Sequence, residues 1–432
     1  MRSPAPGRRA FSRRQALAGI AAVACTGLLE APGAAETSSR LSAIAKLLGV
    51  ERRYAGAGLR FDIGAVYPET GAGAVYGAHV GDIPKLAFKH IAAMGGPHFN
   101  LILKDNRSGD PQAGAQAVRE LGFAKVPMML SSYAADLGAM LTGIDRYHIL
   151  SLDGSGGTSI FAQDKPCFWG SIATTPNDAM PGVIAYLTAA MPAVATLSTI
   201  AWDLGSLGDM VANDVVRAFA GSDFKLGVAE KTRIGSTDYS TSLLKLKDSA
   251  PDLVLCVLYG EDLGYFMKQY ALSGIGKPVM AFTHSIVAEE IAGPAYDDLY
   301  FAFDYFDAAS PSNPWAKFYI DEFYKIEGTY YPPDNYGANA YEDVFTLWEC
   351  VRRVLENGGD PHDGSQLDAA LRARPTFPSL YGGDDRNAGR LTFDLRTHSV
   401  AKRQMTIGQF KDGKIVPLAH FETGGANFKL VL

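Results

Sequence analysis

Short apolar runs alternate with longer amphipathic segments along most of this chain. The apolar runs have the length of buried strands, and the segments between them repeat with the period of a helix. Strands are expected over 61–66, 100–104, 126–130, 194–202, 224–229, 253–258 and 278–282, and helices over 78–94, 111–121, 208–220, 239–247 and 261–273. A loop-rich stretch at 154–175 divides the series. The pattern predicts an α/β protein with two lobes, parallel sheets and a cleft at the carboxyl ends of the strands.

The segment from Phe61 to Gly77 is the most informative part of the pattern. It runs as strand, Pro/Gly turn and helix start, so its backbone N–H groups are expected to face outward and hold a polar or anionic group. Gly71, Gly73 and Gly77 approximate a dinucleotide-binding fingerprint, with Asp105 in place of the ribose-binding acid. The last glycine interval is one residue too long, and Asp105 lies well beyond the usual distance of about 20 residues. An exported NAD(P)-dependent oxidoreductase is therefore kept as the alternative function.

Residues 1–35 have the order of an export signal. A stretch with four arginines is followed by an uncharged run and then by small residues. Ser12–Leu17 resembles the twin-arginine signal, although Ala16 stands where phenylalanine is preferred. We expect cleavage after Ala35 and a periplasmic protein. A rival interpretation makes Cys25 a lipidated N-terminus, which the apolar residues beyond it disfavour.

The composition narrows the classes of partner. The formal charge is −6, and it falls to −10 when the five arginines and one glutamate of residues 1–35 are removed. An acidic chain without basic patches disfavours nucleic acid and anionic membranes as partners. Three cysteines remain, Cys167, Cys256 and Cys350, and an odd number excludes a complete disulfide framework. Buried free thiols are expected at Cys256 and Cys350, with one disulfide bridge left open as an alternative.

No catalytic motif is evident in the sequence. The glycines around Ser155 do not form a nucleophile elbow, and Gly274–Pro278 lacks the spacer of a phosphate-binding loop. The histidines form no zinc-type pair with a nearby acid. We therefore expect a binding protein that is not an enzyme and holds no cofactor or metal.

The order of motifs resembles the leucine/isoleucine/valine-type periplasmic solute-binding proteins of ABC transporters. The motifs that carry the resemblance are Ile63–Gly71, Ser236–Ser240 with Pro251–Val254, Gly389–Asp394 and Gln409–Gly413. The resemblance covers roughly 60–420. It implies a type I fold of two doubly wound Rossmann-like lobes, joined by three crossings and closing on a ligand by hinge motion. Lobe 1 would comprise 57–176 plus 303–388, and lobe 2 would comprise 177–302 plus 389–432.

The resemblance also implies a ligand site. A ligand carboxylate would bind two strand ends of lobe 1, and aromatic side chains of both lobes would cover the ligand. The implied residues are Tyr76, Ser131, Ser132, Tyr133, Asp153, Gly154, Ser155, Trp202, Tyr259, Glu261, Thr283, His284 and Tyr336. The implied partners are a small solute and the permease subunits in the inner membrane, and we expect a monomer.

The chain departs from the family where an acid usually pairs with the ligand ammonium. Thr283 and His284 occupy that position, so Asp153, Glu261 or Asp203 would have to replace the acid, or the ligand has no ammonium. Simpler structural roles compete at several positions. Trp202 is more often a packing residue, and Glu261 at a helix start would complement the helix dipole.

Overall fold

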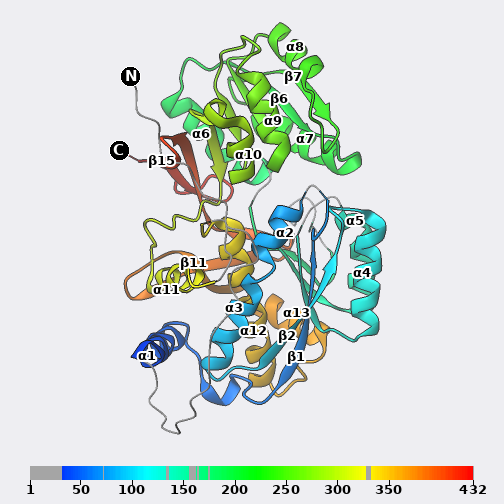
Figure 1. Ribbon diagram of the computed structural model, residues 1–432, viewed down its shortest axis with the longest axis vertical. Coiled ribbons are helices and arrows are strands. Elements are labelled where there is room, and N and C mark those ends of the chain that lie inside the picture. The colour runs from blue at the N-terminus through cyan, green and yellow to red at the C-terminus, as the bar shows by residue number, and fades with distance from the viewer. Residues whose placement is uncertain are drawn as a thin grey trace, which may run out of the picture. The chain divides into compact units, whose positions relative to one another are not determined.

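The predicted strands fold into two eight-stranded sheets, one in each of two α/β lobes (Figure 1). The computed structural model describes residues 32–71, 73–132, 136–154, 162, 165–173, 176–326 and 332–431. The chain divides into one unit over 1–39 and a second over 40–432, and both sheets belong to the second unit. The described part of the first unit is the beginning of α1 (Pro32–Leu47), which runs across the predicted cleavage point. The rest of the predicted leader, Cys25 included, lies outside the described residues.

The sheet of lobe 1 has the strand order β11-β12-β13-β5-β4-β3-β1-β2. Its strands are β1 (Arg60–Tyr67), β2 (His98–Asp105), β3 (Met128–Ser131), β4 (Leu150–Asp153), β5 (Phe168–Gly170), β11 (Thr376–Asp384), β12 (Asn387–Asp394) and β13 (Ser399–Lys402). The strands from β2 to β13 along the sheet pair in parallel, and β11 and β12 add an antiparallel edge. One core cluster joins the sheet to α4 (Pro111–Phe123) and α5 (Leu137–Tyr147). A second joins it to α3 (Ile83–Ala93), α11 (Pro314–Phe323), α12 (Asn335–Glu356) and α13 (Gly364–Ala373).

The sheet of lobe 2 has the order β16-β15-β14-β10-β9-β8-β6-β7. Its strands are β6 (Thr196–Trp202), β7 (Lys225–Thr232), β8 (Leu253–Val257), β9 (Val279–Ala281), β10 (Tyr300–Phe303), β14 (Gln404–Lys411), β15 (Lys414–Glu422) and β16 (Lys429–Leu430). The five strands from β7 to β10 are parallel. α6 (Pro176–Ala190) and α7 (Ser206–Phe219) share one core cluster with this sheet. α8 (Ser240–Asp248), α9 (Gly260–Tyr270) and α10 (Ile286–Ala292) share the other.

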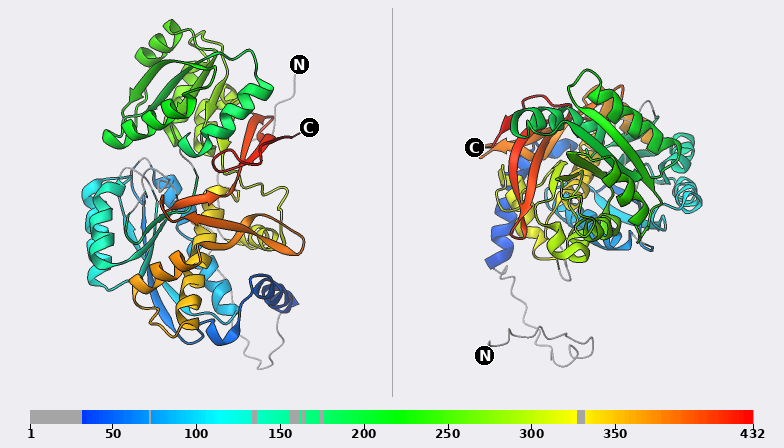
Figure 2. Two further views of the ribbon diagram at one scale, coloured as in Figure 1. Left: turned by 180° about the vertical axis from the view of Figure 1, so that it is seen from behind. Right: turned by 90° about the horizontal axis from the view of Figure 1, so that it is seen from above.

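The chain crosses between the lobes three times, as the type I fold requires. The crossings follow β5, β10 and β13. Figure 2 shows the C-terminal strands, which come after the last crossing, from behind. The last crossing falls at Arg403, because β12 and β13 still belong to the lobe 1 sheet. This crossing lies later in the chain than residue 388, the predicted end of the second lobe 1 segment.

Most of the predicted elements lie where the pattern places them, and one helix does not. The expected helix over 78–94 is two helices, α2 (Ala74–Val80) and α3, so the prediction of a single helix was wrong. Pro84 explains the break, because its ring would clash with the carbonyl four residues earlier in a continuous helix. Asp110 caps the N-terminus of α4, because its Oδ1 accepts hydrogen bonds from the N–H groups of Gln112 and Ala113 at 2.8 and 2.9 Å.

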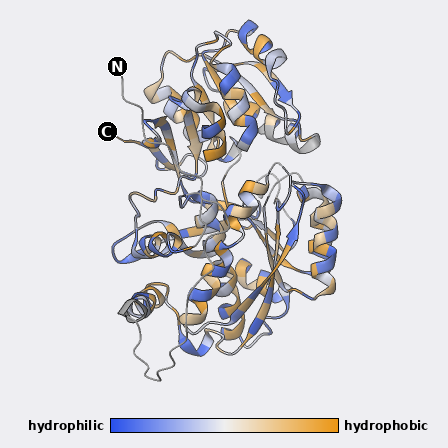
Figure 3. Ribbon diagram, viewed as in Figure 1, coloured by the Kyte–Doolittle hydropathy of each residue, from blue (hydrophilic) through white to orange (hydrophobic). Residues whose placement is uncertain are grey.

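The apolar residues concentrate on the strands and on the helix faces that cover them (Figure 3). Cys167, Cys256 and Cys350 are buried and free, which confirms the expected thiols at the latter two positions. Burial raises the pKa of Cys350 to about 12, so this thiol is unreactive at neutral pH. In the described part of the chain, none of the helices combines the length and apolar character needed to cross a bilayer.

Candidate functional site

The loop after β1 uses its outward N–H groups within the protein. Asp105 Oδ1 accepts hydrogen bonds from the N–H groups of Glu69 (3.0 Å), Thr70 (3.2 Å) and Arg107 (2.7 Å), and Thr70 Oγ1 donates to Asp105 Oδ2 at 2.6 Å. Ser108 Oγ accepts from the N–H of Gly73 at 2.8 Å. The expectation that these groups hold a ligand was therefore wrong, and Asp105 caps the loop instead of binding a ribose.

The glycines of this loop have packing roles. Gly71 has φ +88°, a conformation that favours glycine, and an added Cβ would lie 2.7 Å from Ser108 Oγ. A Cβ on Gly77 would overlap the carbonyl oxygen of Pro68. Gly77 thus lets α2 begin directly against the turn that follows β1, which positions Tyr76 and His79.

Asp105→Ala is expected to destabilise the protein by about 1–3 kcal/mol at pH 7, because several loop N–H groups lose a charged acceptor. Burial alone would raise the pKa of Asp105, but the hydrogen bonds from Thr70, Arg107 and Glu69 lower it below its ordinary value. The stabilisation by Asp105 is therefore complete above the unfolded pKa of about 4 and is lost as the pH falls through the folded pKa. Urea unfolding at pH 7 and pH 3 measures both effects. A difference between the two proteins that does not shrink at pH 3 would contradict this account.

The lobe 1 candidates meet at the carboxyl ends of β3 and β4. Ser131 and Asp153 are register partners, and Ser131 Oγ donates to Asp153 Oδ2 at 2.6 Å. The N–H of Gly154 donates to the Ser131 carbonyl at 2.9 Å, and the N–H of Ser132 donates to the Val66 carbonyl at 3.2 Å. These donors, which the resemblance assigns to a ligand carboxylate, are engaged within lobe 1. Two further candidates, Tyr133 and Ser155, lie outside the described residues.

In lobe 2, Trp202 and Tyr259 form an aromatic pair beside a buried acid. Their ring centroids are 5.0 Å apart, and Trp202 Nε1 donates to Asp262 Oδ2 at 2.6 Å. Burial raises the pKa of Asp262, although hydrogen bonds from Gly235 and Trp202 oppose the shift. Asp262 was missed in the sequence, where it is one of two acids in the first turn of α9. Its neighbour Glu261 is half-buried in that turn.

Two tyrosines of lobe 1 reach lobe 2. Tyr76 Oη donates to Ser285 Oγ at 2.7 Å, and the position of a Cβ on Gly260 lies 3.2 Å from the Tyr76 ring. Tyr336 Oη and Thr283 Oγ1 are 3.1 Å apart, and the two tyrosine rings meet edge to face at 5.6 Å. The structure thus brings Tyr76, Tyr336 and Thr283 together across the lobes. Ser285 was missed, and its signal is its place as the N-cap of α10.

His284 is packed among aromatic rings of lobe 2. Its ring stacks on Phe410 at 5.8 Å, and Nδ1 lies 3.2 Å from Tyr296 Oη. Burial lowers the pKa of His284 to about 4, so the imidazole is neutral at pH 7. It therefore offers a ligand no positive charge.

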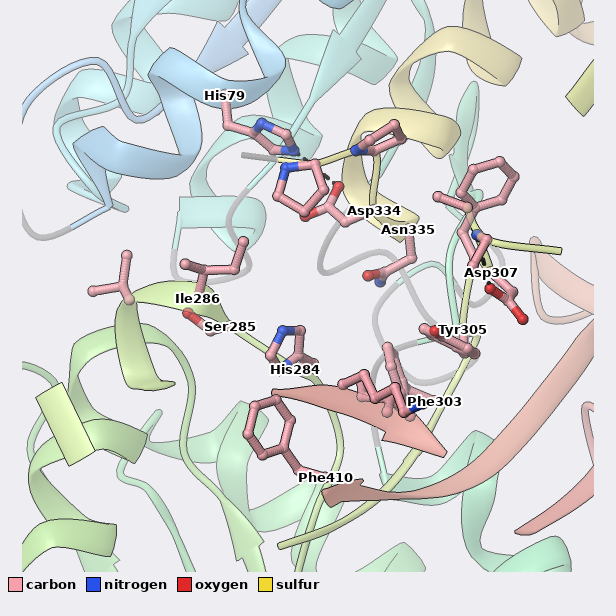
Figure 4. Close-up of a pocket in the computed structure, with 18 of the residues that line it drawn as sticks. His79, His284, Ser285, Ile286, Phe303, Tyr305, Asp307, Asp334, Asn335 and Phe410 are labelled. Carbon is pink, nitrogen blue, oxygen red and sulfur yellow. Dashed lines mark hydrogen bonds and ion pairs between the residues drawn. The ribbon is translucent and has the colours of Figure 1, made fainter. Parts of the chain in front are cut away.

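A cavity of about 340 Å³ has Tyr76 in its wall, and we call it the hinge-side cavity (Figure 4). Burial would lower the pKa of His79, but the Asp334 carboxylate 2.9 Å from its Nε2 raises it. Of the predicted site residues, Tyr76 and His284 line this cavity and the other described candidates do not. Its walls include Tyr76, His79, His284, Ser285, Tyr305, Asp307, Asp334 and Lys414.

Comparison with known proteins places this geometry in a family. Residues 61–414 match the family model described as periplasmic binding protein. The leucine binding protein LivK of Thermotoga maritima shares 17% identity and a TM-score of 0.72, covering 83% of this chain and 98% of its own. The branched-chain amino acid binding protein LivJ of Streptococcus pneumoniae, in complex with isoleucine, shares 17% identity and a TM-score of 0.68, covering 83% and 99%. A solute binding protein of R. palustris in complex with benzoate shares 19% identity and a TM-score of 0.67, covering 87% and 98%. At these identities the likeness establishes the fold.

Within the described residues, no group of three or more His, Cys, Asp or Glu side chains is arranged to hold a metal ion.

Proposed function

Because the chain belongs to the periplasmic binding protein family, we propose that it is an exported receptor that binds a small solute between its lobes and delivers it to the permease of an ABC transporter. The observation that carries the proposal is the pair of contacts Tyr76–Ser285 and Tyr336–Thr283, each of which joins the two lobes. Solved proteins of the same fold bind leucine, isoleucine or benzoate. An amino acid or a related amide or carboxylate is the starting class for a search.

The arrangement suits capture by closure. Tyr76 and Tyr336 of lobe 1 meet edge to face where they contact lobe 2, and Trp202 and Tyr259 form a second aromatic pair within lobe 2. Such rings bury apolar parts of a ligand while their polar atoms orient it. The three crossings let the lobes separate as rigid bodies, so that solute enters, and close again. We further propose that residues 1–35 direct export by the twin-arginine pathway and that the protein acts as a monomer.

Thermal unfolding in the presence of single solutes tests this function. Because a ligand that binds only the folded protein stabilises it, a solute at ~100 times its Kd adds about 2.7 kcal/mol. Amino acids, their amides, aromatic acids and amines form the screen. A shift that saturates with concentration supports the proposal. A folded chain that no class of solute stabilises would contradict it.

Tyr76→Ala is expected to weaken binding of the solute found in that screen by roughly tenfold or more, because the substitution removes an aromatic side chain that would contact the solute. Tyr76→Phe keeps the ring and loses only the hydroxyl bonded to Ser285, so its effect should be smaller. Isothermal titration measures both affinities. Tyr147→Phe is the control, because this tyrosine lies on α5 against Phe123. Equal affinities for Tyr76→Ala and the control would exclude Tyr76 from the site.

A further inference from the structure

One face of α12 extends from the contact between the lobes to the floor of the lobe 1 site. Tyr336, Asn339 and Asp343 are three and four residues apart, so they lie on this face. Tyr336 reaches Thr283 of lobe 2. Asn339 and Asp343 lie next to Gly154, whose Cβ position is 3.5 Å from Asp343 Oδ2 and 3.8 Å from Asn339 Nδ2. The helix therefore brings two polar side chains to the strand end where the family resemblance implies a ligand.

The Ser171 hydroxyl lies between Asp343 and a backbone carbonyl. Ser171 Oγ lies 3.0 Å from the Asp153 carbonyl oxygen and 2.8 Å from Asp343 Oδ2. Asn339 Nδ2 also approaches Ser171 Oγ at 3.3 Å. The serine has one proton, so it can donate to the Asp153 carbonyl or to Asp343 but not to both. When it donates to the carbonyl, the contact with Asp343 is a hydrogen bond only if the acid is protonated.

The surroundings of Asp343 favour its protonated form. Burial raises its pKa, the hydrogen bond from Ser171 opposes the rise, and the nearby carboxylates of Glu342 and Asp153 add to it. The remaining groups that face it are the phenol of Tyr67 and the guanidinium of Arg403. Arg403 is already paired with Asp304 and Glu342. Burial beside these carboxylates therefore favours the neutral acid in the protein without ligand.

Two oxygen atoms on this face have no donor among the described residues. Asn339 Oδ1 and Asp343 Oδ1 accept no hydrogen bond there, and their residues are only 0% and 2% exposed. Buried acceptors in native proteins are normally satisfied, so these two call for a partner. A ligand group that completes them must donate. By contrast, the donors expected to clamp a carboxylate are engaged, with the Ser131 hydroxyl bonded to Asp153.

Resting on the proposed function, we propose that the solute presents an N–H-rich cationic group, an ammonium or guanidinium, to the Asn339–Asp343 face of α12. This reverses the polarity that the family resemblance implies for the lobe 1 site. When the cation arrives, the Asp343 carboxylic acid transfers its proton to solvent, and the carboxylate pairs with the cation. Binding therefore releases up to one proton, and the affinity rises with pH until Asp343 is ionised in the free protein.

Isothermal titration of the purified full chain with putrescine and agmatine, and with benzoate as the anionic comparison, tests the inference. Titrations in phosphate and in Tris at pH 7 differ in heat if a proton is released, and this readout needs no variant. We expect a diamine or guanidine to bind with proton release. Asp343→Asn, which is isosteric, should weaken that binding roughly 10- to 100-fold and abolish the release. Asp145→Asn, at an exposed site on α5, is the matched control.

The outcomes separate this inference from the function on which it rests. Benzoate binding that is unchanged by Asp343→Asn, with neither cation bound, would overturn the cationic class and leave the receptor function standing. Cation binding without proton release, or with the same affinity in Asp343→Asn, would remove Asp343 from the site. A folded chain that binds none of the three probes and nothing in the wider solute screen would overturn both proposals.

Discussion

Replacing Arg403 with methionine is expected to lower the free energy of unfolding by about 3–5 kcal/mol, because it leaves two buried carboxylates without their cation. The guanidinium pairs with Asp304 at 3.2 Å and with Glu342, and all three side chains are at most 1% exposed. It also lies over the Tyr381 ring, 4.4 Å from its centroid. Methionine retains much of the packing and removes the charge, so the variant isolates the electrostatic contribution.

The position of this cluster makes the loss relevant to hinge motion. Asp304 follows β10 in the second crossing, Arg403 is the third crossing, and the N–H of Ala173 in the first crossing donates to the Asp304 carboxylate. Asn335 Nδ2 at the start of α12 lies 3.3 Å from Asp304 Oδ1. All three crossings are thus joined at one carboxylate, and a change in its charge acts on every segment that the lobes turn about.

The pH dependence follows from the same contacts. Burial raises the pKa of Asp304 to about 7, although Arg403 opposes the shift. An acid whose folded pKa exceeds its unfolded value of about 4 binds its proton more tightly when folded, so stability falls as the pH rises between the two. Without Arg403 the folded pKa rises further. The deficit of Arg403→Met should therefore be larger at pH 7.5 than at pH 5.

Urea unfolding at the two pH values checks this prediction. Lys402→Met is the control, since Lys402 is the exposed neighbour and its substitution removes the same charge from the chain. We expect the control to change stability by no more than about 0.5 kcal/mol. Equal losses in the two variants would show that Arg403 contributes only net charge.

The fold was largely predictable because each strand and helix carries its own periodicity. The strands β1 to β3 and β6 to β9 needed only local patterns, whereas β4 and β5 were not among the expected strands. The last crossing was not predictable in the same way. Whether β13 joins lobe 1 depends on its pairing with β5, a strand of three residues more than two hundred positions earlier. Such a long-range pair leaves no periodic signal in either segment.

The candidate site residues also differ in how far the sequence could place them. Ser131 and Asp153 end adjacent parallel strands, and the family resemblance implied both strand ends. Asn339 and Asp343 lie in a helix whose buried face includes many other residues, so their role depends on which strand end that face meets. Asp105 shows the converse, because the sequence placed it correctly at a strand end but its partners turned out to be loop N–H groups.

Gly77→Ala is expected to destabilise the protein by about 1–3 kcal/mol and to weaken solute binding as well. The added methyl group would overlap the backbone carbonyl of Pro68, and backbone does not rotate aside as a long side chain does. The start of α2 must then move away from the turn. Tyr76 immediately precedes Gly77, so its hydroxyl would lose alignment with Ser285 of lobe 2. The variant therefore tests whether the close approach of Gly77 to Pro68 is needed for the Tyr76–Ser285 contact between the lobes.

Chemical unfolding gives the stability of this variant, and titration with the solute from the screen gives its affinity. Gly138→Ala is the matched control, because Gly138 is exposed on α5 and its Cβ would meet nothing within 4 Å. Alanine at that helical position should stabilise by up to about 1 kcal/mol and leave affinity unchanged. If Gly77→Ala lowered stability with no loss of affinity, α2 would position Tyr76 independently of the turn. If both variants behaved alike, the close approach to Pro68 would have no role in the fold.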